Sequence, residues 1–460
     1  MVRLQDVREL NACLDAEVLR TCQAAGGTSA ARCGFEREVQ RAGLTHEARP
    51  YPVSARPYLV TAASMRLVAQ VCEAAVDWVD RIAGLLQGTT HGRQLETAYG
   101  PAMFRDETPR PRPAPYICRV DGMVAEDGSY RILEINTACP GGVMHTGTAT
   151  RLWLEHSGGL PGGREVTAGG QEIILDPACL QRQLLAGYKR FTQSAASTVG
   201  VVNFSGRLSH EADAIRRGFE ELGAAAEIID AASLRYDGTK ALTGPGRAID
   251  LLYSKIYPPD LADPGLADFC DAAAHGKFML FNPLVAQWHL ESKATLAFLS
   301  DESLSTGLLA PGERDLAREI VPWTRIVADC RTGGPVGDHI DLLDYIDANR
   351  EHLVLKPCQS MRGDGVCIGD NVPPGQWRDA IRSALHRPHV VQQRVRSQCV
   401  IAARPRSGEL RRMRTGLDCF IFSGRSVGLH ARASENDVIN IAQHGMLLPV
   451  ACAAADTMRD

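Results

Sequence analysis

The segment YICRVDGMVAEDGSYRILEINT, residues 116–137, constrains the fold more than any other stretch of the chain. Stretches of alternating polar and apolar residues flank Asp127 and Gly128, a pair typical of two-residue hairpin turns because both turn positions need positive φ. With these two residues as the turn, Asp121 lies directly opposite Glu134. The sequence therefore predicts an antiparallel hairpin that places two acids across from each other.

The predicted hairpin has one polar face and one apolar face. The polar face also carries Arg119 and Asn136, which lie opposite each other, and the apolar face is expected to pack through Val120, Gly122, Val124, Leu133 and Ile135. Directly opposed like charges are destabilising, so a partner must offset the repulsion. Carboxylate and amide oxygens are hard ligands that suit Mg2+, and a neighbouring arginine suits a phosphate. We therefore predict a magnesium site at Asp121, Glu134 and Asn136; the alternative is a solvated hairpin whose acids pair with nearby basic residues.

Length and composition exclude several classes of protein. The 460 residues suffice for about two to four domains, and the net charge of −4 indicates no general attraction to nucleic acid or to anionic membranes. No stretch approaches about 18 uncharged apolar residues, and the first residues lack an apolar targeting region. The fourteen cysteines show neither a CxxC pair nor zinc-type spacing. We therefore expect a cytoplasmic protein with reduced cysteines.

Lysine is scarce, with six lysines against forty-four arginines, so each lysine is informative. Lys356 ends the apolar strand HLVLK, and the loop that follows holds Gly363 and Gly365. Backbone amides of a glycine-rich turn can approach phosphate oxygens closely. The alternative is an ordinary hairpin with an exposed lysine. Lys293 falls in the predicted helix AQWHLESKATLAFLSDE. The alternative to a functional role for this lysine is an ordinary surface charge.

Two later segments complete the pattern. The strand VVQQRV enters a linker at Gln392, where exposed backbone groups are suited to hold a purine ring. Arg432 lies in the otherwise apolar strand GLHARAS, and a half-buried arginine needs an anionic partner. The alternative to a functional role is an ion pair with an acid on the neighbouring strand.

A strand–helix–strand unit is predicted in TVGVVNF, SHEADAIRRGFEELG and AAEIID, near residues 198–230. Its first turn lacks GxGxxG, and the chain contains no GxxxxGK[ST], so the sequence excludes the common dinucleotide and P-loop motifs.

Taken in order, these segments resemble the ATP-grasp ligases in their circularly permuted form, as in the synthetase domain of glutathionylspermidine synthase; the hairpin also resembles that of D-alanine:D-alanine ligases. The resemblance covers roughly residues 115–450 and implies an α/β (α+β) fold. The domains implied are a mainly helical N-terminal region at 1–110, a permuted metal hairpin segment at 111–160, a pre-ATP α/β domain at 170–275, and ATP-grasp N- and C-lobes at 276–395 and 396–460.

The resemblance also implies roles for individual residues. Asp121, Glu134 and Asn136 resemble magnesium ligands, Arg119 resembles the arginine that stabilises the transferring phosphate, and Arg432 resembles a late arginine that reaches the γ-phosphate. The implied ATP-binding residues are Lys293, Lys356, Gly363, Gly365, Gln392, Gln393 and Val395. Cys139 and His145 receive no catalytic role and are placed near the acceptor.

The implied reaction is ATP-dependent activation of a small-molecule carboxylate as an acyl phosphate, followed by attack of an amine, with release of ADP and phosphate. Three alternatives stay open: acylation of a carrier-protein thiol, an ATP-grasp kinase, and a non-catalytic nucleotide-binding protein. The expected partners are therefore small molecules, with a carrier protein and a second copy of the chain left open, and neither nucleic acid nor membrane.

Overall fold

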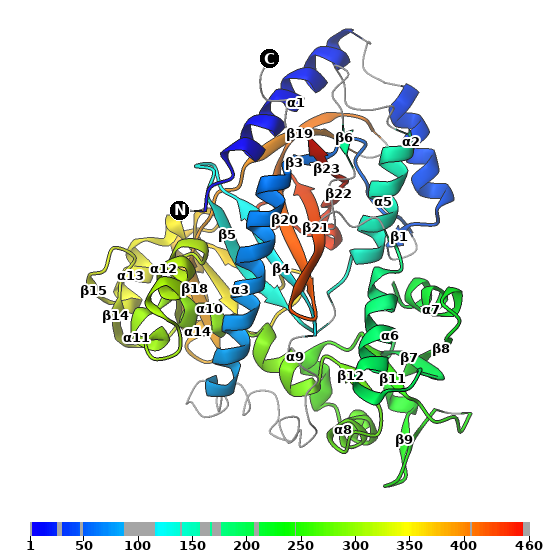
Figure 1. Cartoon of the computed structure of the whole chain (residues 1–460). Helices are drawn as coiled ribbons and strands as arrows, with labels where there is room; N and C mark the ends of the chain where they lie inside the picture. Colours follow the sequence, from blue (N-terminus) through cyan, green and yellow to red (C-terminus); the bar gives the residue numbers. More distant parts are fainter. Residues whose placement is uncertain are drawn as a thin grey trace.

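The computed structural model describes residues 2–24, 30–46, 49–86, 116–138, 140–156, 166–167, 176–206, 211–243, 245–404 and 407–453. These residues form a mixed α/β structure in which helices pack on three larger sheets (Figure 1). The mixed α/β class expected from the sequence is thus confirmed. None of the described helices is long and apolar enough to cross a membrane.

The largest sheet joins two hairpins that are far apart in the sequence. Its strand order is β22-β21-β20-β4-β5, and β19 also pairs with β20. The bounds are β4 Ile117–Val124, β5 Tyr130–Asn136, β19 Cys399–Ala403, β20 Leu410–Phe422, β21 Arg425–Ser434 and β22 Met446–Leu448. β4 runs antiparallel to β20, with Val120 opposite Cys419. The acidic hairpin and the strand that carries Arg432 therefore belong to one sheet.

A long helix, α3 (Ala62–Leu86), covers this sheet (Figure 1). Its fully buried residues Val68 and Val79 share one core with Val120 and Leu417 of the sheet. This packing fixes the back of the hairpin, so its polar face is free to line a site on the opposite side.

A second sheet is fully parallel, in the order β12-β11-β7-β8, and matches the predicted strand–helix–strand unit. Its strands are β7 Thr198–Asn203, β8 Ala225–Asp230, β11 Leu251–Ser254 and β12 Met279–Phe281, and its helices are α6 Cys179–Thr192, α7 Ala212–Glu221 and α8 Ala267–Ala274. In this order β8 and β11 lie on opposite sides of β7. Such a reversal point is where parallel sheets place their functional loops.

A third sheet carries Lys356 and has the order β13-β18-β16-β17. Its strands are β13 Thr324–Ile326, β16 Leu353–Pro357, β17 Cys367–Ile368 and β18 His389–Gln393, and its helices are α10 Ala294–Ser300, α12 Pro311–Ile320, α13 Leu342–Ala348 and α14 Pro374–Ala384. Trp323 and Trp377 anchor a separate core beneath this sheet. This sheet therefore faces the hairpin as a distinct unit.

The beginning and end of the described chain pack together. β3 (Tyr58–Val60) runs parallel to β23 (Val450–Ala453), which also pairs with β6 (Val166–Thr167). The remaining elements here are α1 Gln5–Ala24, α2 Ala30–Arg41, α5 Val143–His156, β1 Thr45–His46 and β2 Arg49–Pro50. The predicted boundaries at 110 and 160 lie outside the described residues.

The helix predicted across Lys293 is broken in two. α9 (Leu284–Glu291) ends before Ser292, and α10 begins at Ala294. Lys293 precedes α10 and is 3% exposed, so the surface-charge alternative is wrong. Further short elements are α11 Glu302–Ser305, β9 Arg235–Tyr236, β10 Ala241–Leu242, β14 Arg331–Gly333 and β15 His339–Asp341.

The predicted register of the acidic hairpin is confirmed where it bears on the site. Asp121 lies opposite Glu134, and Arg119 lies opposite Asn136. These four side chains therefore project from neighbouring positions on two paired strands.

The route to this register differs from the predicted one. Val124 pairs with Tyr130, and the loop between them closes with Gly128 at φ +82°. The Ala125 N–H also donates to the Ser129 carbonyl at 2.8 Å, so the loop consists of residues 126–128, one more than the predicted two-residue turn. A β-bulge between Asp121 and Gly122 takes up the extra residue and restores the register.

The bulge moves Leu133 away from the predicted apolar face. Ile132 lies in the core, whereas Leu133 is half-buried and lines a pocket beside Glu134. The prediction that Leu133 packs with Val120 is wrong, because the extra residue of the bulge interrupts strict alternation.

We predict that Gly122→Ala destabilises the protein by about 1–3 kcal/mol, because overpacking a filled core forces neighbours to move. A Cβ at Gly122 would lie 2.3 Å from the Oη of the buried Tyr130. Thermal unfolding measures the change. Gly375→Ala is the matched control: its Cβ would meet nothing within 4 Å in the first turn of α14, so no loss of stability is expected. Equal melting temperatures for wild type and Gly122→Ala would contradict the packing argument.

Candidate functional site

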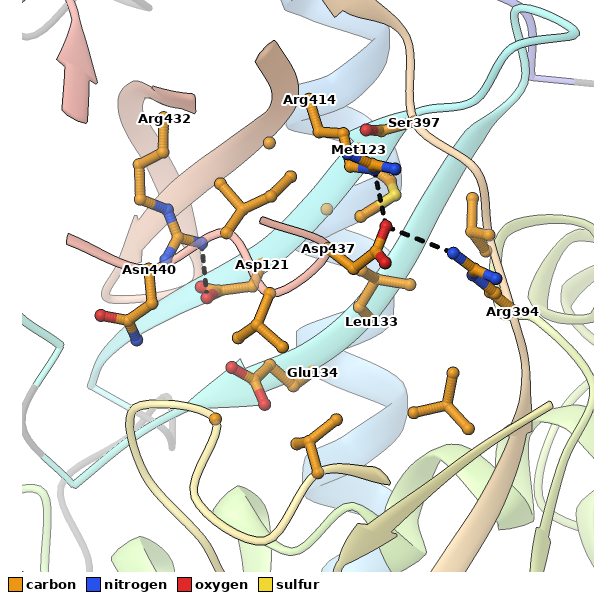
Figure 2. A pocket seen from close by; sticks show the side chains of 18 of the residues that line it. Asp121, Met123, Leu133, Glu134, Arg394, Ser397, Arg414, Arg432, Asp437 and Asn440 are labelled. Atoms are coloured by element: carbon orange, nitrogen blue, oxygen red, sulfur yellow. Dashed lines mark hydrogen bonds and ion pairs between the residues drawn. The ribbon is translucent and has the colours of Figure 1, made fainter. Parts of the chain in front are cut away.

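A pocket lies between the acidic face of the central sheet and the sheet that carries Lys356 (Figure 2). One wall comes from β4, β5, β20 and β21, and the other comes from β16, the glycine-rich loop and the segment after β18. The predicted residues that line it are Arg119, Asp121, Glu134, Asn136, Lys356, Gly363, Gln392, Gln393, Val395 and Arg432. Lys293 and Gly365 are outside this lining. The fold thus gathers residues from distant segments into one cavity.

Asp121 is held between two guanidinium groups. Arg119 donates to both of its oxygens, from Nε at 2.6 Å and from Nη2 at 2.9 Å. Arg432 donates from Nη2 to Asp121 Oδ2 at 2.8 Å (Figure 2). Burial raises the pKa of Asp121, but the charges and hydrogen bonds of the two arginines outweigh it and hold this pKa below its ordinary value. Asp121 is therefore an anion.

A third acid at this site, Asp418 on β20, was missed at the sequence level. It is fully buried, accepts a hydrogen bond from the Gly122 N–H at 3.2 Å, and forms an ion pair with Arg432 Nε at 2.7 Å. Burial raises the pKa of Asp418 to about 7, although Arg432 lowers it. The available signal was an acid inside the apolar run LDCFIF. Arg432 therefore has both a cross-strand acid and Asp121 as partners.

Lys293 approaches the hairpin from the break between α9 and α10. Its Nζ lies 3.1 Å from Glu134 Oε2 and donates to the Ser360 carbonyl at 3.3 Å. Burial lowers the pKa of Lys293, but Glu134 and Glu291 outweigh it, so the net pKa is raised. Lys293 is therefore a buried cation that joins the hairpin to the glycine-rich loop.

Lys356 approaches from the end of β16. Its Nζ donates to Gln392 Oε1 at 2.6 Å and to the Leu133 carbonyl at 3.5 Å. Burial lowers the pKa of Lys356 to about 8, and the positive charge of Lys293 acts in the same direction. The Gln392 side chain is oriented in turn by its Nε2, which donates to Thr324 Oγ1 at 3.0 Å.

The glycine-rich loop bends through left-handed backbone conformations. Arg362, Gly363 and Gly365 have φ values of +58°, +78° and +74°. The loop meets the segment after β21, because Gln443 Nε2 donates to the Arg362 carbonyl at 2.8 Å. A Cβ at Gly363 would lie 2.6 Å from Val438 Cγ1. The two segments therefore close over the pocket from opposite walls.

The segment after β18 adds charged residues that the sequence did not single out. Arg394 forms an ion pair with Asp370 at 2.5 Å. Asp437 pairs with Arg394 at 3.2 Å and with Arg414 at 2.6 Å (Figure 2). Gln393, in contrast, is exposed. These ion pairs connect the segment after β18 to both walls of the pocket.

His145 lies away from the lining of this pocket, in a separate buried cluster. Its Nδ1 lies 3.1 Å from Glu211 Oε1, and Lys255 Nζ donates to Glu211 Oε2 at 2.8 Å. Glu211 also accepts from the Gly142 N–H at 2.9 Å. The cluster touches the pocket through Arg119, which donates to the Gly141 carbonyl at 2.9 Å. Cys139 lies outside the described residues.

The predicted magnesium ligands offer two acids and one amide. Among the residues that the structure describes, no cluster of three or more His, Cys, Asp or Glu side chains has the geometry of a metal site. The set at Asp121, Glu134 and Asn136 nevertheless supplies hard oxygens on one strand pair, and the buried Asn136 Nδ2 has no hydrogen-bond partner. Such a donor set fits Mg2+, which keeps waters and phosphate oxygens among its ligands.

Comparisons with known proteins add little to this geometry. No protein-family model matches the chain, and no curated protein matches it. Among solved structures, D-cycloserine synthetase DcsG aligns with a TM-score of 0.26 and 17% sequence identity, over 43% of this chain and 58% of that one. A likeness this weak carries no argument about fold or chemistry.

We predict that the glycine-rich loop becomes protected when nucleotide binds. Hydrogen exchange across residues 358–366 should slow by up to about a hundredfold when Mg2+ and a non-hydrolysable ATP analogue are present at about 100 times the Kd. Gln443→Ala should reduce this protection, because it removes the bond to Arg362. α14 serves as an internal reference with unchanged exchange. Identical loop protection with and without the analogue would show a static cradle.

We predict that affinity for the ATP analogue falls as the pH rises above 8. The pKa of Lys356 is about 8, so below this pH its ammonium attracts phosphate, and above it binding must first take up a proton. The expected loss is up to about tenfold per pH unit, measured by calorimetry between pH 7 and 10. Lys356→Arg should bind more weakly but lose this pH dependence, because a guanidinium stays charged. The same slope in both proteins would assign the effect to another group.

Proposed function

We propose that this protein is an ATP-dependent carboxylate–amine ligase that forms an amide bond through an acyl phosphate. One observation carries the proposal: Lys356 lines one pocket with Asp121 and Glu134 beside a glycine-rich loop, and Lys293 forms an ion pair with the same Glu134. This arrangement is suited to a polyphosphate held together with a divalent cation. The proposal includes a circularly permuted ATP-grasp fold, since the hairpin that precedes the lysine segments in the chain joins β20 in space.

The proposed ATP site divides along the pocket. The purine would lie against the segment at Gln392, Gln393 and Val395, which lines one end of the pocket. The phosphates would lie between Lys293, Lys356 and the loop with Gly363 and Gly365. Loop closure would exclude water from a reactive acyl phosphate, which would otherwise hydrolyse.

Asp121, Glu134 and Asn136 would hold Mg2+, which when bound neutralises phosphate charge. The arginines around Asp121 have a second role in this proposal. Without ligand, Arg119 and Arg432 neutralise the Asp121 carboxylate. When Asp121 turns to the metal ion, the two guanidinium groups would be placed to hold the oxygens of the transferring phosphate. Asp418 keeps Arg432 in place during this exchange, because it holds the Nε side of the same guanidinium.

The residues that line the pocket support charge stabilisation rather than covalent catalysis. In the proposed reaction the carboxylate oxygen of the substrate attacks the γ-phosphorus of ATP, and ADP leaves. The amine then attacks the acyl carbon, the carbon–oxygen bond to phosphate breaks, and inorganic phosphate leaves. Both steps need positioned cations, which Arg119, Arg432, Lys293 and Lys356 supply.

We predict that Asp121→Asn, Glu134→Gln and Asn136→Ala each lower ADP formation by at least about a hundredfold, because each removes a proposed ligand of the Mg2+ that would neutralise phosphate charge. A screen of carboxylates with amines identifies the substrate pair, and hydroxylamine then traps the acyl phosphate as a hydroxamate. The fold should persist in circular dichroism.

Asp127→Asn on the same hairpin is the matched control, since this exposed acid lies in the turn and asparagine can keep its bond to Ser129. Normal ADP formation by all three site variants across a Mg2+ titration would reject the proposal. ADP formation without hydroxamate, in the presence of a hydroxyl substrate, would instead indicate a kinase.

A further inference from the structure

The open end of the acidic hairpin is held by a distant segment, residues 282–293. Asn282 follows β12 and is 1% exposed. Its Oδ1 accepts from the N–H groups of Tyr116 at 2.8 Å and Ile117 at 3.0 Å, and its Nδ2 donates to the carbonyls of Ile117 at 2.6 Å and Thr137 at 2.9 Å. One side chain thus ties the start of β4 to the residue that follows β5.

Glu291, the last residue of α9, holds the same exit from β5. It is 5% exposed, and its Oε2 accepts from the N–H groups of Thr137 at 2.9 Å and Ala138 at 2.5 Å. Both bonds end at a single oxygen. Because Thr137 directly follows Asn136, a shift of these two amides moves Asn136 with them.

The same short segment also reaches the other acid of the hairpin. Lys293 lies two residues after Glu291, and its Nζ is 3.1 Å from Glu134 Oε2. Glu291 therefore fixes the backbone on one side of Asn136, while Lys293 fixes a side chain on the other. Both contacts depend on the break between α9 and α10.

The segment that follows β5, residues 137–142, is also held at its far end, at Gly141 and Gly142. Arg119 donates to the Gly141 carbonyl, and Glu211 accepts from the Gly142 N–H. Among the described residues, Glu291 is the side chain that accepts from the backbone N–H groups of Thr137 and Ala138. Loss of its bonds would remove the acceptor of both N–H groups next to Asn136, while Asn282 would still hold the Thr137 carbonyl and the anchors at Gly141 and Gly142 would stay in place.

We propose that Glu291 is a positioning residue for the metal site, acting through the backbone amides of Thr137 and Ala138 to place Asn136 beside Glu134. The inference deepens the proposed function and rests on it, because Asn136 and Glu134 are taken as metal ligands there. Partners of this kind outside the ligand set typically change metal affinity by about 10–100-fold when they are removed.

Substitutions of Glu291 can separate the effect of its side-chain length from the effect of its charge. Burial raises the pKa of Glu291 to about 7, and Glu134 does more than Glu291 to keep Lys293 protonated. A glutamine keeps the reach of the side chain and one carbonyl oxygen, which suffices for both bonds. An aspartate keeps the charge but is one methylene shorter, so its oxygen cannot meet both amides.

The experiment measures Mn2+ binding by electron paramagnetic resonance, with the ATP analogue adenylyl imidodiphosphate present. Glu291→Asp should weaken Mn2+ affinity by about tenfold or more, and Glu291→Gln should remain within about twofold of wild type. Thr137→Val is the control, because it removes only the side-chain bond to the Gln287 carbonyl and keeps both backbone amides. Circular dichroism melts establish that each variant is folded, and Glu291→Ala carries the same test if the aspartate variant is not.

The outcomes separate this inference from the function on which it rests. Wild-type protein that binds no Mn2+ with the analogue would overturn the proposed function. Normal Mn2+ affinity in folded Glu291→Asp or Glu291→Ala would overturn the positioning role alone. A large loss in Glu291→Gln with normal affinity in Glu291→Asp would also overturn it, because the effect would then belong to charge.

Discussion

Two carboxylates that face each other across a strand pair repel, and the surrounding structure is organised around offsetting that repulsion. Asp121 is paired with Arg119 from its own strand and with Arg432 from β21, whereas Glu134 is paired with Lys293 from the break before α10. These cations come from three separate parts of the chain. The acidic face is therefore balanced only after the second hairpin and the lysine-bearing segment have docked against it.

The local part of this arrangement could be predicted from sequence, because alternation and the Asp127-Gly128 pair depend on nearby residues. The register at Asp121 was predicted correctly although the turn was wrong by one residue. The extra residue of the bulge, Leu133, compensates for the extra residue of the loop. As a result, Asp121 and Glu134 remain on the same face of the hairpin. Pattern alone cannot reveal two irregularities that cancel, since only the net register is visible in it.

The parts that sequence could not supply depend on packing between distant segments. Asp418 reads as one acid in an apolar run, and its relation to Arg432 follows from the pairing of β20 with β21. Glu291 and Lys293 fall within one continuous predicted helix, in which side chains two residues apart point in different directions, but the break at Ser292 brings both to the hairpin. Helical periodicity carries no information about where a helix ends against a neighbour.

The charge balance of the pocket also indicates where a bound anion would gain most. Arg119, Arg432 and Lys293 already have carboxylate partners, so a ligand phosphate that recruits them must exchange one anion for another. Lys356 differs, because its hydrogen-bond partners are the neutral Gln392 amide and the Leu133 carbonyl, and burial lowers its pKa to about 8. Glu134 and Asp121 offset only part of the desolvation of Lys356, so a phosphate beside it would add counter-charge where the protein supplies least. An anion in the pocket is therefore expected to gain more from Lys356 than from Lys293, although both lysines lie beside the same hairpin.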